Sequence, residues 1–225
     1  MQSPNGLLLI DKPAGMTSFG VVARVRRQLS QIAGKKVKVG HTGTLDPFAT
    51  GLMVIVVGDY CKRAGEFTKL DKSYEATVVL GKTSSTGDPE GEITEVSTTK
   101  PSEAQIKDAL VPFIGTISQT PPVYSAIKIG GQRAYKLARQ GKEVVMPTRQ
   151  VTIYSLELVS YAYPALKIAC AVSSGTYIRT LAEDIGTILR TGAYTSELRR
   201  TTVGGWRVDV AISPDRVTYD DLISA

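Results

Sequence analysis

Cysteine and histidine are scarce in this sequence. Its 225 residues include two cysteines, Cys61 and Cys170, and a single histidine, His41. The cysteines lie far apart and fit no metal-ligand spacing, so we expect two free thiols in a reducing cytosol rather than a disulfide framework. One histidine cannot build a usual transition-metal site, and His41 has no persuasive nucleophile partner in sequence for a serine or cysteine triad. The sequence therefore predicts no metal site.

Long apolar runs are also missing. The run at residues 6–10 is too short for the core of a signal peptide, and Asp11 and Lys12 follow it directly. No stretch approaches the roughly 20 apolar residues that a membrane span requires. A phosphate-binding loop ending at residues 81–83 is excluded because Ala76 stands where its first glycine is needed. We expect a cytoplasmic protein with no membrane partner.

The sequence does have a modest excess of positive charge. Its formal net charge is +6 and its pI is about 9.3, which fits a polyanionic partner but is weak evidence alone. Basic and aromatic residues are interleaved over residues 124–139, either as a solvated face or as a nucleic-acid clamp, with three of the bases expected on one side of a short helix. The clamp candidates are Lys128, Arg133, Lys136 and Arg139, and Arg199 belongs to a second basic point.

Strand and helix periodicities follow one another without a regular βαβ order. A capping box of Ser102 and Gln105 opens one helix, and Gly130 and Gly131 are expected to close a hairpin. Residues 82–92 are expected to form a polar loop. The pattern predicts an α+β fold with a mixed, mostly antiparallel sheet. Strands are expected at 6–10, 52–57, 73–81, 151–159, 165–173 and 205–210. Helices are expected from 17 or 18 to 29, at 102–113, at 176–189 and at 219–223, together with a short basic helix that ends at 141.

The most unusual local feature is the segment GHTGTLDP at residues 40–47. Gly40 and Gly43 allow positive φ or a close approach of the backbone, and Pro47 pushes Asp46 towards an extended conformation. A loop between two apolar strands is a position where a rigid scaffold can present a carboxylate. The alternative is that Asp46 only caps the turn at residues 49–51. On these residues alone the two interpretations are evenly balanced.

Tyr74 and Arg179 are two further candidates. Tyr74 lies on an expected strand, either as a half-buried core residue or as a ring that stacks on a base and supplies an oxygen for proton transfer. Arg179 lies in the first turn of an expected helix, where a cation opposes the helix dipole and prefers an anionic partner. It is either an ordinary surface arginine or a planar fork that fixes the Asp46 carboxylate.

Six sequence blocks occur in a specific order: GLLLIDKPAGMTS, GHTGTLDPFATGLM, DKSYEATVVLG, YSAIKIGGQRAYKLARQG, SSGTYIRTLAEDIG and ELRRTTVG. In this order they resemble the bacterial-type tRNA pseudouridine-55 synthase family, TruB. The likeness runs from Gly6 to about Val210, which is nearly the whole chain. Within it, the block GHTGTLDP corresponds to the catalytic loop of the family.

The resemblance implies a role for each matching residue. Asp46 matches the catalytic aspartate, Arg179 matches the arginine that pairs with it, and Tyr74 matches the tyrosine that stacks on the target base and is a candidate for proton handling. The other matches are Leu198 and Tyr177 in the base pocket, His41 as a residue that holds the RNA in its base-flipped form, and Lys12 in a Lys-Pro motif that is mainly structural.

The resemblance also implies a pseudouridine synthase core over residues 1–225, with an insertion at about 120–146 that closes over the RNA. Family members usually carry a further C-terminal RNA-binding domain, often of the PUA type, and this sequence is expected to lack it. The implied reaction is isomerisation of uridine 55 in the T arm of tRNA, without a cofactor. We expect a monomer with no obligatory protein partner.

Two other functions stay open at this point. One is a non-catalytic RNA-binding or tRNA-folding module that uses the pocket only to hold a flipped base. The presence of Asp46, Tyr74 and Arg179 together argues against it. The other is a guide-RNA-dependent synthase of the Cbf5/dyskerin type, which the compact length and the insertion disfavour. Activity on a bare T-arm transcript would separate the two synthase types.

Overall fold

The computed structural model describes residues 4–224, and the chain divides into two compact units. Unit 1 consists of residues 1–74 and 199–225, and unit 2 of residues 75–198. Two strands, β4 (Lys72–Leu80) and β12 (Ala193–Val203), contribute residues to both units. Over residues 4–224, no helix combines the length and the apolar character needed to cross a membrane.

The central strand of unit 1 is β3 (Thr50–Val57), an apolar segment with seven buried residues. It pairs antiparallel with β1 (Gly6–Lys12) on one side and with β2 (Val39–His41) on the other. It also pairs in parallel with β12, and β13 (Trp206–Arg207) pairs with β12 in turn. Because β3 is buried, its apolar residues run without interruption from Leu52 to Val57.

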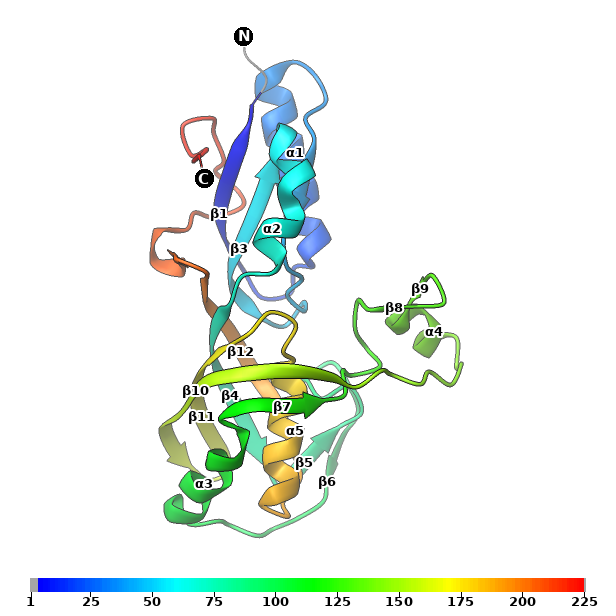
Figure 1. Ribbon diagram of the computed structural model, residues 1–225, viewed down its shortest axis with the longest axis vertical. Helices are drawn as coiled ribbons and strands as arrows, with labels where there is room; N and C mark the ends of the chain where they lie inside the picture. The colour runs from blue at the N-terminus through cyan, green and yellow to red at the C-terminus, as the bar shows by residue number, and fades with distance from the viewer. Residues whose placement is uncertain (1–3, 225) are drawn as a thin grey trace. The chain divides into compact units, whose positions relative to one another are not determined.

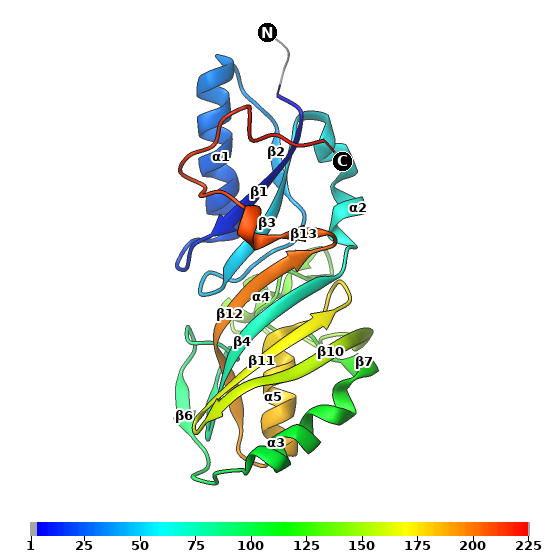
Figure 2. The same cartoon turned by 90° about the vertical axis from the view of Figure 1, so that its left-hand side faces the viewer.

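Helices cover both faces of β1 and β3, with α1 (Ser18–Ala33) on one side and α2 (Ala64–Thr68) on the other (Figure 2). The expected cap is confirmed, because the Thr17 hydroxyl accepts a hydrogen bond from the Gly20 amide at 2.9 Å, and the C-cap residue Gly34 is in the left-handed conformation. The 3-10 helix η1 (Gly58–Arg63) precedes α2, whose Phe67 packs against Leu7 and apolar residues of β3.

The C-terminal segment of unit 1 lies along the outer edge of β1. Leu7 and Ile223 exchange two backbone hydrogen bonds of 2.9 Å, and the Ile212 amide donates to the oxygen of Leu9. The helix expected at residues 219–223 is therefore wrong, because the segment forms only one turn, closed by the Leu222 amide on the Tyr219 oxygen at 3.2 Å, before Ile223 pairs with the strand edge. The strand expected at 205–210 is limited to β13, and the 3-10 helix η3 (Val208–Val210) follows it.

Lys72 is a buried cation at the start of β4, with an exposed fraction of 7%. Its Nζ donates to the carbonyl oxygens of Thr68, at 2.8 Å, and of Leu70. Burial, together with the nearby charge of Arg200, lowers the pKa of Lys72 from 10.5 to about 8. The folded state therefore holds this proton less tightly than the unfolded state does.

Replacement of Lys72 by methionine is expected to change how stability depends on pH. Between about pH 8 and 10.5 the unfolded lysine binds a proton that the folded lysine has lost, so this group makes stability rise with pH in that window. Between pH 7 and pH 10, the free energy of unfolding should rise by about 2 kcal/mol more in the wild type than in the variant. Denaturant titrations of both proteins at the two pH values measure it. A constant difference between them would contradict the lowered pKa.

The sheet of unit 2 has the strand order β12-β4-β11-β10-β7. Strands β7 (Gly115–Gln119), β10 (Arg149–Ala162) and β11 (Ala165–Val172) are antiparallel neighbours. Helix α5 (Ile178–Ile188) packs its buried face on this sheet (Figure 1). Since β3 and β12 of unit 1 are parallel and most other pairs antiparallel, the predicted α+β class with a mixed sheet is confirmed.

Smaller elements complete unit 2. The capping box of Ser102 and Gln105 is present and opens α3 (Glu103–Leu110), which the 3-10 helix η2 (Val111–Phe113) follows. The loop expected at 82–92 is wrong in its first residues, because β5 (Lys82–Ser84) pairs with β6 (Ile93–Glu95). The predicted hairpin at Gly130 and Gly131 is confirmed by β8 (Lys128–Ile129) and β9 (Gln132–Arg133), and α4 (Ala134–Arg139) follows.

Candidate active site

The loop that carries Asp46 leaves β2 and enters β3, and side chains of unit 1 fix it along its length. The hydroxyl of Ser18, in the first turn of α1, donates to the oxygen of Leu45 and accepts from the amide of Leu45, both at 2.8 Å. The amide and the hydroxyl of Thr42 both donate to the oxygen of Val54 at 3.1 Å. The residue immediately before Asp46 is thus fixed by a buried side chain.

Arg200 supports the same loop from β12. Its side chain is 2% exposed; Nε donates to the oxygen of Leu52 at 2.7 Å and Nη2 to the oxygen of Gly43 at 3.2 Å. Glycine is required at position 51, where φ is +105° and a Cβ would lie 2.3 Å from the backbone oxygen of Arg200. Unlike the neighbouring Arg199, Arg200 therefore directs its charge to backbone oxygens of unit 1.

Lys12 fixes the residue that follows Asp46. Its side chain is fully buried, and Nζ donates to the oxygens of Pro13 (2.9 Å), Met16 (2.7 Å) and Pro47 (3.0 Å). The amide of Gly15 donates to the same Pro47 oxygen at 2.8 Å. Three carbonyl acceptors compensate the buried ammonium group. The half-buried Asp46 therefore stands between two fixed backbone positions, 45 and 47.

The other sequence candidates of unit 1 lie on strands. His41 is half-buried at the end of β2, and Tyr74 is 8% exposed on β4. The guanidinium of Arg199 forms a two-bond ion pair with Asp11, with Nη2–Oδ2 and Nη1–Oδ1 distances of 2.8 and 3.1 Å. Its Nη1 also lies 3.4 Å from Thr50 Oγ1. Its side chain remains 40% exposed, so this cation is partly accessible to solvent.

In unit 2, Arg179 is a buried arginine in the first turn of α5. It is 3% exposed, and Nη1 donates to Asp88 Oδ2 at 2.8 Å and to the oxygen of Thr86 at 2.7 Å. Its Nη2 donates to the oxygen of Tyr124 at 2.8 Å. A surface arginine is thereby excluded, and an anionic partner is present, as the helix position predicts. The ion pair fixes the orientation of a planar group.

Asp88 is itself held in place. Its Oδ1 accepts from the hydroxyl of Thr86 at 2.6 Å and from the amide of Glu90 at 3.0 Å. The preceding Gly87 has φ +72°, and a Cβ there would lie 2.7 Å from Oε1 of Glu183. The carboxylate is 5% exposed, so removal of either partner of this pair would leave a buried charge.

Tyr177 occupies the position before α5 and is fixed through its backbone. Its amide donates to Gln119 Oε1 at 2.7 Å, and its oxygen accepts from Gln119 Nε2 at 3.0 Å. The guanidinium of Arg149 lies over the ring, 4.9 Å from its centroid. Leu198, the last residue of unit 2, is 8% exposed on β12. The start of α5 thus places Tyr177 and Arg179 on a rigid support.

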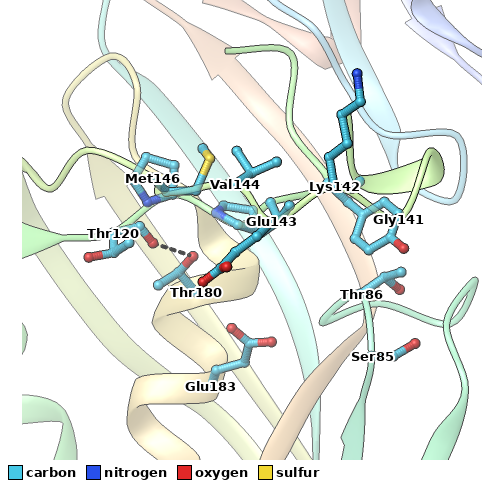
Figure 3. A pocket seen from close by; sticks show the side chains of 15 residues that line it. Ser85, Thr86, Thr120, Gly141, Lys142, Glu143, Val144, Met146, Thr180 and Glu183 are labelled. Carbon is cyan, nitrogen blue, oxygen red and sulfur yellow. Dashed lines mark hydrogen bonds between the residues drawn. The ribbon is translucent and has the colours of Figure 1, made fainter. Parts of the chain in front are cut away.

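A cavity of about 750 Å³ lies between the insertion and α5, where Thr180 and Glu183 face residues of the insertion (Figure 3). The hydroxyl of Thr180 donates to the oxygen of Thr120 at 3.4 Å. Burial raises the pKa of Glu183, although the charge of Arg179 opposes the shift. Thr86 and Tyr124, which bind Arg179, also line this cavity. Tyr124 therefore links residues 120–146, at their N-terminal end, to the group of residues that holds Arg179 in place.

The four clamp candidates of the insertion are exposed. Arg139 lies over the ring of Tyr135, 5.8 Å from its centroid. Arg133 precedes α4, and its Nη1 donates to the oxygen of Ala126 at 3.1 Å, so the expectation that it shares a helix side with Lys136 and Arg139 is wrong. Among residues 4–224, no cluster of histidine, cysteine and acidic side chains could hold a metal ion. The exposed set is Lys128, Arg133, Lys136 and Arg139.

Sequence reasoning missed most of the residues that hold the candidates in place. Asp88 falls within the polar loop expected at residues 82–92, and it lies 91 positions before Arg179 in the sequence. Ser18 was read as a possible helix cap, whereas Thr17 caps α1 and Ser18 binds Leu45. The one available signal was the position of Arg179 in a first helical turn, which calls for an anion but does not identify it.

Two family models match this chain. The model described as TruB family pseudouridylate synthase (N terminal domain) matches residues 27–178. The model described as tRNA pseudouridylate synthase B C-terminal domain matches residues 179–225. The first match includes Asp46 and Tyr74, and the second begins at Arg179.

Similar proteins carry a consistent description. A protein of Parabacteroides distasonis named tRNA pseudouridine synthase B is 43% identical over 96% of this chain and 92% of its own length. One of the same name from a Mycobacterium species is 44% identical over 97% and 74%. Among solved structures, a Cbf5-Nop10-Gar1 complex contains a chain with a TM-score of 0.70 and 28% identity over 93% of this chain. This chain spans about half, 52%, of that relative.

Proposed function

The chain belongs to the TruB family of pseudouridylate synthases, and from this membership we propose that it isomerises uridine 55 in the T arm of tRNA to pseudouridine. Relatives that match it over most of their length are named tRNA pseudouridine synthase B. The observation that carries the proposal is the Asp46 loop. A carboxylate flanked by two fixed residues, 45 and 47, suits a catalytic group that must attack one particular atom.

The reaction needs no net change in composition. The bond between N1 of uracil and C1′ of ribose breaks, the base turns, and a bond between C5 and C1′ forms. One proton leaves C5 and N1 gains one. In our proposal the ionised Asp46 attacks either C1′ of the sugar or C6 of the base as a nucleophile. The bond between Asp46 and the substrate then breaks, which restores the free carboxylate.

Four other residues complete the site in this proposal. Arg179 orients the Asp46 carboxylate through its planar fork. Tyr74 stacks on the uracil ring and takes or relays the proton from C5. Leu198 and Tyr177 line the pocket and exclude water. Buried or rigidly held side chains at these positions support the assignment.

The target base must leave its stack before it can react, which costs a few kcal/mol. We propose that His41 and the insertion at 120–146 offset this cost by holding the flipped form. The exposed bases of the insertion, and Arg199 in part, would contact the phosphates. Recognition would favour the folded shape of the T arm over helical sequence, because side chains cannot read the bases in the deep, narrow major groove of an A-form helix. The enzyme needs tRNA as its only partner in this account.

A T-arm hairpin transcript tests the proposed function. Incubation with the purified chain, without guide RNA or other proteins, should convert uridine 55 to pseudouridine and leave the other uridines unchanged. A hairpin with cytidine at that position is the matched control and should gain no pseudouridine. Conversion only after addition of a guide RNA would favour the Cbf5/dyskerin type. Tight binding without conversion would favour the non-catalytic module.

A further inference from the structure

One long segment of unit 1 contains no acidic residue. Between Asp11 and Asp46, residues 12–45 include seven lysines and arginines and neither aspartate nor glutamate. Two of these seven cations are used within the unit. The buried Lys12 donates hydrogen bonds to three backbone carbonyl oxygens, and Arg24 forms an ion pair with Asp215. Five remain available for a partner outside the chain.

We call these five residues the basic track. Four of them are exposed and Arg26 is half-buried, and within residues 4–224 none forms an ion pair with a carboxylate. The pKa of Asp59 is lowered mainly by Lys62, which is bound to its carboxylate at 2.6 Å, and the charge of Lys38 only adds to this shift. The track consists of Arg26, Arg27, Lys35, Lys36 and Lys38.

The track runs along α1 and the segment after it. The helix begins at Ser18, which is bound to the Asp46 loop through Leu45, and ends at Ala33. Sixteen residues at 1.5 Å per residue place the other end of the helix about 24 Å from this start. Figure 2 shows α1 on the side of β1 and β3 that α2 does not cover. The track therefore leads away from the catalytic loop.

An exposed aromatic residue lies at the end of the helix nearest the loop. Phe19 is 68% exposed, and the guanidinium of Arg26 lies 5.8 Å from the centroid of its ring. Cations near a helix C-terminus stabilise its dipole, which would account for Lys35 and Lys36. That effect does not account for Arg26 and Arg27, which lie in the middle of α1 with no acidic residue in the helix.

We propose that the basic track binds the phosphate backbone of the substrate RNA, outside the loop that carries the target uridine. The inference rests on the proposed function, because it takes tRNA as the substrate. Regularly spaced phosphates suit a line of cations without acidic neighbours, and lysines act on them as compact point charges. Because the far end of the track is about 24 Å from the start of α1, a full tRNA engages it more completely than a short hairpin does.

Equilibrium binding at several salt concentrations tests the proposal. The test variant is the double substitution Lys35→Gln and Lys36→Gln. The matched control is Lys69→Gln with Arg207→Gln, which removes two exposed charges from the same unit outside residues 12–45. The RNAs are an unmodified tRNA transcript and a T-arm hairpin, each with cytidine at the target position so that binding is measured without turnover.

The test variant should bind the full transcript roughly tenfold more weakly than wild type at low salt. Its slope of log affinity against log salt should fall by about 1 to 2, since each phosphate contact contributes roughly 0.7 to 0.9. The hairpin should lose less affinity, and the control variant should match wild type. An unchanged affinity and slope on both RNAs, or an equal loss in the control, would overturn the proposal.

Pseudouridine formation on an ordinary hairpin, measured in parallel, separates this inference from the proposed function. If the wild type converts the hairpin but the test variant binds tRNA normally, the track proposal alone fails. If the wild type converts no RNA, the proposed function fails, whatever the salt slopes are.

Discussion

Replacement of Asp46 by asparagine is expected to abolish pseudouridine formation and to leave tRNA binding largely intact. Asparagine has nearly the shape of aspartate, and the contacts that fix the loop come from Leu45, Pro47 and their neighbours. The loop should therefore keep its conformation. The amide cannot act as the carboxylate nucleophile, so the chemical step loses its reacting group.

Single-turnover conversion of a T-arm transcript, with binding measured separately, checks this expectation. Thermal unfolding of the variant shows whether the fold is kept. Turnover within tenfold of wild type, equivalent to about 1.4 kcal/mol in the barrier, would remove Asp46 from the role of nucleophile. A variant that loses binding and turnover together would assign Asp46 to RNA recognition instead.

Replacement of Arg179 by lysine should produce a severe rate defect although the positive charge is kept. The two terminal nitrogens of Arg179 serve three acceptors, on Thr86, Asp88 and Tyr124. A lysine ammonium is a single point and cannot serve both ends of this set. Since misplacement of about 1 Å can cost a hundredfold in rate, we expect a loss of at least about that size.

A matched Arg→Lys change shows whether the defect is specific. Arg207→Lys alters an exposed pair with Asp209 and should leave the rate unchanged. Asp88→Asn provides a second test of the same network, because it keeps the shape of the partner and removes its charge. It should destabilise the fold by about 3 kcal/mol and also slow the reaction. A normal rate in folded Arg179→Lys would limit the Arg179–Asp88 pair to a structural role.

Local sequence signals identified the elements that depend on local contacts. Helical periodicity up to residue 29 identified α1, and Val21, Val25 and Leu29, which recur on one helical face, are buried in the structure. Ser102 and Gln105 identified the start of α3 because a capping box involves only neighbouring residues. The Gly130-Gly131 hairpin was found for a similar reason. These signals do not depend on the rest of the fold.

The elements that the sequence did not indicate depend on distant partners. Strand β12 contains Ser196, Glu197, two arginines and three threonines, so its pattern is too polar to be read as a strand. Its pairing with β3, and the close approach at Gly51, supply what the pattern lacks. The C-terminal error has the same cause, because Ile223 pairs with Leu7 at the other end of the chain.

The candidate site divides in the same way. Asp46, Tyr74 and Arg179 were predicted by sequence, but for Asp46 the residues alone left two interpretations in balance and the ordered family blocks decided between them. The residues that hold the loop, such as Ser18 and Arg200, carry no signal because the fold alone brings them to it. The contribution of the structure is therefore the rigidity of the loop.

The most direct test of the central claim is a map of pseudouridine in a T-arm transcript treated with the purified chain alone. No guide RNA, second protein or cofactor is added, and a chelator is present to remove metal ions. We predict a single new pseudouridine at position 55, formed by the wild type and not by Asp46→Asn. No pseudouridine from folded wild type, or pseudouridine only at other positions, would contradict the account.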